Sequence, residues 1–92
     1  LWRISQYTNN DWDTYDSAVV VAETAEEARH VHPSPEYYMW RDGQWCYSYG
    51  ALEPVSKMSD WAMPVDVKAD LVGEAAPHLQ GGAVICASFN AG

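Results

Sequence analysis

Two apolar segments near the start of the chain predict neighbouring β-strands. Residues 1–8 alternate loosely, with Trp2 and Ile4 on one side and polar residues on the other, as in a strand with one buried face. Residues 17–23 have a β-branched centre and are apolar on both faces, which predicts a central strand. The Asn- and Asp-rich residues 9–16 between them predict a turn, because these side chains bond their own backbone.

A short helix is predicted to follow the second strand. Residues 24–27, TAEE, fit a capping box, in which the Thr24 hydroxyl accepts a hydrogen bond from the Glu27 amide and the Glu27 side chain reaches back to the Thr24 amide. Prolines at positions 33 and 35 end the helix near His32. Later in the chain, residues 65–71 alternate apolar with polar side chains and residues 83–89 form an apolar run, which predicts two more strands.

Residues 36–61, here called the aromatic insert, separate the helix from these last strands. The insert contains Tyr37, Tyr38, Trp40, Trp45, Tyr47, Tyr49 and Trp61. Asp42-Gly43 lies between two β-prone runs and predicts a tight hairpin. Alternate residues of a strand share a face, so one face of the hairpin is expected to pack on the sheet and the other to present rings.

Together these segments predict a single α+β domain over residues 1–92, with a small antiparallel sheet in the order strand, strand, helix, insert, strand, strand. The pattern leaves the spatial order of the strands open. One helix cannot cover both faces of a four-stranded sheet. We therefore expect either the aromatic insert or a second subunit to cover the other face, and we expect a homo-oligomer.

The charge balance narrows the choice of partners. Thirteen carboxylates face five Lys and Arg residues, for a net charge of -8, which argues against binding to nucleic-acid backbone or to anionic membranes. An acidic surface favours steering toward a basic protein. No apolar run of membrane-spanning length or signal-like segment is present, and the two cysteines lie in separate segments, which predicts a cytoplasmic location.

The acidic turn contains Asp11, Asp13 and Asp16, which are potential calcium ligands. An EF-hand loop starting at Asp11 needs Gly at its sixth position and Glu at its twelfth, where this chain has Asp16 and Ala22. Hydrogen-bonded Asx turns are therefore the preferred interpretation.

Other metal-ligating and catalytic residue types occur without a recognisable pattern. His30, His32, His78, Cys46 and Cys86 lack paired spacing, so neither a metal nor a cofactor is predicted. The histidines near the helix end are expected to interact with its dipole. No nucleophile elbow or phosphate loop is present, and Cys46 is more simply an interior thiol than a nucleophile, so the sequence predicts no enzyme.

One family resemblance extends this interpretation. The run 10–29, NDWDTYDSAVVVAETAEEAR, is followed by His32-Pro33, by Gly-Glu-Ala at residues 73–75 and by the ending ASFNAG. In these features the chain resembles a group of short, uncharacterised proteins encoded by phages and prophages, over its first third and last quarter. The resemblance implies a phage setting, in which small accessory proteins commonly inhibit host defences by stoichiometric binding. The aromatic insert does not align with the group.

The sequence therefore predicts a non-enzymatic binding protein that occupies a host defence component through an acidic, Tyr- and Trp-rich surface. Trp40, Trp45 and Tyr47 are the predicted anchors. Tyr38 and Arg41 are expected beside them, with Glu36 and Asp42 as rim charges.

Two alternatives stay open. The insert could form a cleft that sequesters a nucleotide-derived immune signal, with a base stacked on the rings and Arg41 or Lys57 near a phosphate. The insert could instead serve only as core or cap for the sheet.

Overall fold

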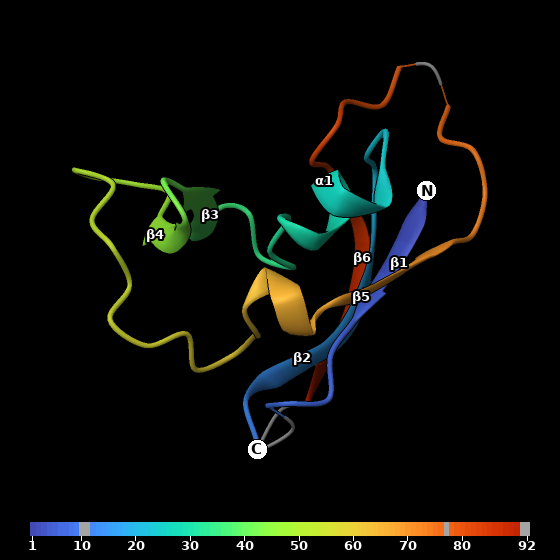
Figure 1. Ribbon diagram of the computed structural model, residues 1–92. Coiled ribbons are helices and arrows are strands. Elements are labelled where there is room, and N and C mark those ends of the chain that lie inside the picture. The colour runs from blue at the N-terminus through green and yellow to red at the C-terminus, as the bar shows by residue number, and fades with distance from the viewer. Residues whose placement is uncertain (10–11, 77, 91–92) are drawn as a thin grey trace.

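The computed structural model describes residues 1–9, 12–76 and 78–90. Its frame is a four-stranded antiparallel sheet with the spatial order β5-β1-β2-β6 (Figure 1). The strands are β1 (Trp2–Ser5), β2 (Thr14–Val20), β5 (Lys68–Leu71) and β6 (Val84–Asn90). A two-stranded sheet and one short helix complete a small α+β domain, which confirms the predicted fold class.

The core face of the sheet follows from the strand register. Ile4 on β1 lies opposite Ala18 on β2 and Ala69 on β5, and Val20 lies opposite Trp2. Strand β2 begins earlier than predicted, at Thr14, because Asp13 closes the turn in the left-handed region with φ 60°. The acidic turn is therefore shorter than the sequence suggests, and Asn10 and Asp11 in it lie outside the described residues.

Helix α1 (Ala25–Arg29) forms where the capping signal predicts it. The Glu27 amide donates to Thr24 Oγ1 at 3.1 Å. The reciprocal bond goes one residue further back than expected, since Glu27 Oε2 accepts from the amide of Glu23 at 3.1 Å. The buried Ala28 packs the helix against β1 and β5.

The aromatic insert forms the predicted hairpin, with β3 (Tyr38–Arg41) and β4 (Gln44–Tyr47). Asp42 and Gly43 both have positive φ, 52° and 80°, as a two-residue type I′ turn requires. Residues 65–71 were predicted to form one strand, but a 3-10 turn, η1 (Pro64–Asp66), occupies the first part. The Asp66 amide bonds back to the Met63 carbonyl at 2.9 Å, so β5 starts only at Lys68.

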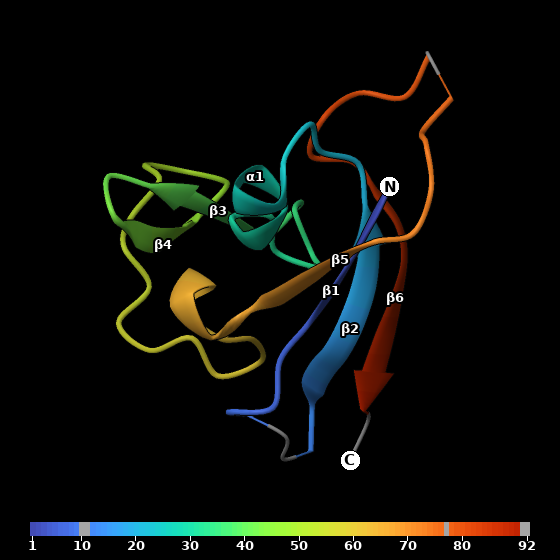
Figure 2. The same ribbon diagram turned by 45° about the vertical axis from the view of Figure 1, so that its right-hand side comes forward.

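The hairpin and the helix lie on the same side of the four-stranded sheet (Figure 2). Ala28 of the helix and Trp45 of the hairpin share one core cluster with Ile4 and Val20 of the sheet. Of the two predicted covers for the second face, the insert is therefore wrong, and a second subunit stays a prediction. That face carries the residues that alternate with Ile4, Ala18 and Val20 along the strands, including the exposed Arg3.

No helix in the described ranges is both long and apolar enough to cross a lipid bilayer.

Candidate functional site

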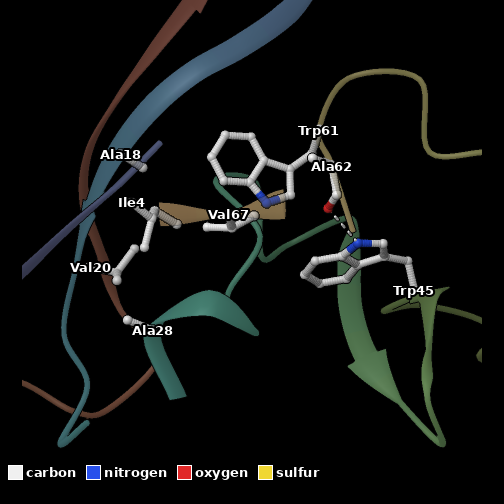
Figure 3. Close-up of a cluster of buried hydrophobic side chains, with 8 residues drawn as sticks. All are labelled: Ile4, Ala18, Val20, Ala28, Trp45, Trp61, Ala62 and Val67. Atoms are coloured by element: carbon white, nitrogen blue, oxygen red, sulfur yellow. Dashed lines mark hydrogen bonds between the residues drawn. The ribbon is translucent and has the colours of Figure 1, made fainter. Parts of the chain in front are cut away.

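A buried histidine organises the junction between sheet and insert. His32 is 1% exposed, and the rings of Tyr15, Tyr38, Trp45 and Trp61 surround it at centroid distances of 4.5–6.3 Å. Figure 3 shows the indoles of Trp45 and Trp61 beside the aliphatic core residues, with Trp45 Nε1 donating to the Ala62 carbonyl at 3.0 Å. The predicted dipole interaction at the helix end holds for His30, whose Nδ1 lies 2.6 Å from the Glu26 carbonyl, but it is wrong for His32.

Both ring nitrogens of His32 are engaged. Nδ1 accepts a hydrogen bond from the Ser34 amide at 2.8 Å, and Nε2 lies 3.0 Å from Asp60 Oδ1. Because Nδ1 accepts, the ring proton is on Nε2 and is donated to the Asp60 carboxylate. This arrangement ties the residues after the helix to the end of the aromatic insert and leaves His32 without a nitrogen for acid–base catalysis.

Ser34 takes part in a second network at the edge of this cluster. Its hydroxyl donates to Glu36 Oε1 at 3.1 Å and accepts from the Tyr15 hydroxyl at 2.9 Å. Ser, His and Asp are thus close together here, but His32 bonds the Ser34 amide and not its hydroxyl. The geometry is that of a buried structural network and differs from a nucleophile activated by an adjacent base.

The two-residue turn places four rings on one face of the hairpin. Tyr38 lies opposite Tyr47, and Trp40 lies opposite Trp45. Trp45 is 2% exposed and belongs to the core, so its side chain is not accessible to a partner. Any partner-binding surface on the insert must therefore consist of other residues. Trp40 is half-buried against Trp45 and His30, at ring distances of 5.2 and 5.4 Å.

Four tyrosines in and beside the hairpin form a connected series of ring contacts. We call them the tyrosine patch: Tyr37, Tyr38, Tyr47 and Tyr49. Tyr38, Tyr47 and Tyr49 follow one another at ring distances of 5.7 and 5.5 Å, and Tyr37 lies edge-on to Tyr49 at 6.5 Å. Tyr37 and Tyr49 are 55% and 56% exposed, whereas Tyr38 and Tyr47 are half-buried. The patch is therefore both anchored in the hairpin and open to solvent.

The remaining predicted site residues lie at the margins. Arg41 and Asp42 are exposed at the hairpin turn, where Arg41 Nε lies 3.6 Å from Asp42 Oδ2. Glu36 is exposed beside Tyr37. Tyr37 and Tyr49, the two most exposed rings of the patch, were not among the predicted anchors. The sequence did contain a signal that separates core rings from surface rings. A two-residue turn fixes the hairpin register, and this register puts four rings on one face: Tyr38, Trp40, Trp45 and Tyr47. The innermost rings of that face must point to the core, so they are poor candidates for a partner-binding surface.

The hollows near the insert do not suit a nucleotide. A cavity of about 210 Å³ lies beside Trp40 and Tyr38 and is smaller than the ~300 Å³ lower bound of ordinary ligand pockets, and none of its described lining residues is Lys or Arg. A groove of about 540 Å³ between α1 and η1 includes Arg29, but Glu26 already holds that guanidinium at 2.7 Å. Neither hollow offers a free cation to a phosphate.

Metal-binding geometry is absent from the described part of the chain, where no three His, Cys, Asp or Glu side chains gather around one point. Asp11, one of the three carboxylates considered for calcium, lies outside that part. Cys46 is buried on the hairpin face opposite the rings, level with Met39.

The phenol of Tyr38 provides a pH-dependent test of this packing. Burial raises the pKa of Tyr38 above its usual value of 10.0, with further contributions from the Asp60 charge and from neighbouring phenols. Because the folded pKa lies above the unfolded one, the stability of the wild type should fall as pH rises above about 10 and should be unaffected below it. Urea denaturation of wild type and Tyr38→Phe at pH 8 and above pH 10 checks this. An equal alkaline loss in both proteins would contradict it.

Comparison of the chain with protein-family models, curated proteins and solved structures gives no match. The resemblance to phage and prophage proteins stays a prediction.

Proposed function

We propose that the protein is a non-enzymatic binding protein that docks on a partner protein through the tyrosine patch. The observation that supports this most directly is the pair of half-exposed rings, Tyr37 and Tyr49, packed edge-on against each other beside a hairpin whose inner face is locked into the core. Tyr side chains offer a large contact area with few rotatable bonds and are enriched among interface hot spots.

The backbone around the patch is well connected. The Ser48 amide bonds the Tyr37 carbonyl and the Tyr47 amide bonds the Glu53 carbonyl, both at 2.9 Å. The Val55 amide bonds the Trp45 carbonyl, also at 2.9 Å. These bonds hold the segments before and after the hairpin against it. A surface ordered before binding loses less conformational entropy on association.

The charges around the patch favour a basic partner. Glu36 and Glu53 are exposed next to it in the chain, and the whole protein carries a net charge of -8. The faces of aromatic rings attract Arg and Lys side chains. An Arg- or Lys-rich protein surface would therefore be steered toward the patch by charge and held there by the rings.

The resemblance supplies the setting of the proposal. We propose that the partner is a host defence component in the host cytoplasm and that the protein antagonises it by stoichiometric occupancy. The two stretches that carry the resemblance include β2 and β6, which are neighbours in the sheet. The insert, which does not align with the group, carries the patch, so the frame and the partner-specific surface would be separate parts of the chain.

The test is recovery of partners from host lysate with wild type and a Tyr37→Ala/Tyr49→Ala double variant. Tyr7→Ala is the matched control, because Tyr7 is an exposed tyrosine outside the patch. We expect the double variant to lose the partner by roughly tenfold or more, as hot-spot truncation does, and the control to retain it. Recovery of the same proteins by all three would remove the patch from the proposal. Trp45→Ala is unsuitable here because it removes a core residue.

A further inference from the structure

Strand β6 forms one outer edge of the four-stranded sheet. Its seven residues, Val84–Asn90, pair with β2 on one side. On its other side no strand of the described chain is hydrogen-bonded to it (Figure 2). A free edge presents backbone N–H and C=O groups at the spacing that another strand needs.

The edge of β6 carries few of the features that protect such strands. It contains no charged residue and no proline, and Ile85 and Phe89 are 48% and 47% exposed. The opposite edge, β5, is only four residues long and carries Lys68 and Asp70. The β2–β6 pair has two irregularities. The first is a bulge at Ile85 in β6, a feature that protects an edge. The second is an extra residue in β2, Asp16, opposite the step from Ser88 to Phe89, so residues 86–90 of β6 itself contain no inserted residue.

We propose that this edge pairs with β6 of a second copy of the chain, antiparallel and centred on Ser88. Each copy carries a net charge of -8, so two copies repel one another over most of their surfaces. The uncharged β6 adds no like charge of its own to such a contact, and its free backbone groups can form hydrogen bonds that compensate for the remaining repulsion. A basic partner attracted by the acidic surface would find no charged side chain to pair with on this strand. Two copies related by a two-fold axis, by contrast, present the same edge strand to each other, so the two edges can match.

The proposed register also suits the side chains. Ala87 and Phe89 face the core side of the sheet, opposite Ala18 and Tyr15 of β2. Centring the pair on Ser88 puts Ala87 of each copy opposite Phe89 of the other, a small residue against a large one. The two Ser88 side chains meet on the other face. The product is a continuous eight-stranded sheet. The β3–β4 hairpin, which belongs to the same insert as the tyrosine patch, lies on the opposite side of the molecule from β6, so the pairing leaves the hairpin free in both copies (Figure 2).

The first test is the sedimentation of wild type, Ser88→Lys and Leu71→Lys. Both variants change the net charge equally at exposed strand positions, but Leu71 lies on β5. Like charges directly opposite one another destabilise a strand pair, so we expect Ser88→Lys to weaken dimerisation by about fivefold. Leu71→Lys should dimerise at least as well as wild type. A wild type that is monomeric at its highest soluble concentration would overturn the proposal, as would an unaffected Ser88→Lys protein.

A second measurement needs no variant. Alternate amides of residues 86–90 point away from β2 and should exchange slowly with deuterium in concentrated wild-type protein, then rapidly after dilution. Amides of β5 should show no such dependence. Exchange in β6 that is independent of protein concentration would refute the pairing even if Ser88→Lys failed to fold. Added salt should tighten the dimer, because it screens the repulsion between two acidic chains, and a dimer weakened by salt would contradict the charge argument.

Discussion

Replacing Trp45 with alanine is expected to destabilise the fold by about 3–5 kcal/mol, which is the usual cost of removing a buried tryptophan. Trp45 is 2% exposed and lies between the hairpin and the core. Small domains are stable by only about 5–15 kcal/mol, so the variant should lose a large part of its stability and unfold at a clearly lower urea concentration than the wild type. Urea denaturation followed by circular dichroism measures the loss.

A pair of phenylalanine variants separates packing from hydrogen bonding. The indole N–H of Trp45 donates to the Ala62 carbonyl, whereas the buried Trp61 N–H has no partner among the described residues. Trp45→Phe therefore leaves a carbonyl unpaired, at a cost of about 1–3 kcal/mol beyond the lost volume, and Trp61→Phe removes a donor that is already unpaired. Trp61→Phe should be the milder change, and equal costs would contradict this account of the core.

The second large effect is expected for His32→Ala. The change removes a ring packed by four aromatic residues and leaves both the Asp60 carboxylate and the Ser34 amide without their partner. Unpaired buried groups cost about 1–3 kcal/mol each, and the cavity adds to this, so we expect a total of at least ~3 kcal/mol.

His30→Ala serves as the control for that experiment. His30 is two residues away, is only half-buried and contacts Trp40 at the edge of the hairpin. Its loss should cost less than about 1 kcal/mol, close to the range of surface substitutions. Similar unfolding midpoints for the two alanine variants would show that the His32–Asp60 bond contributes little to joining the segment after the helix to the end of the insert.

Local signals in the sequence predicted local features of the fold. Asp42-Gly43 specified the hairpin turn and Thr24 specified the helix start, because each acts through backbone atoms within three residues of itself. The start of β5 was missed because the alternation of residues 65–71 satisfies a strand pattern even though Pro64 begins a 3-10 turn.

Features that depend on distant partners could not be predicted. His32 becomes a core residue through Asp60, which is 28 positions later in the chain. The packing of the insert on the same side as the helix depends on how Trp45 and Trp61 meet Ile4 and Ala28, and no local pattern encodes that choice. The candidate site shifted for the same reason, from Trp45 in the core to Tyr37 and Tyr49 outside it.

The strand order has a consequence for how the chain acquires its structure. Both outer strands, β5 and β6, come from the last third of the sequence, so until that third is available the β1–β2 pair has two unpaired sides. A lone two-stranded ribbon is marginal in water. Completing the sheet requires contacts across nearly the whole chain, such as Val72 with Leu1 and Phe89 with Tyr15. Such long-range closure slows folding, so a ribosome-bound nascent chain that lacks this third should remain largely unstructured.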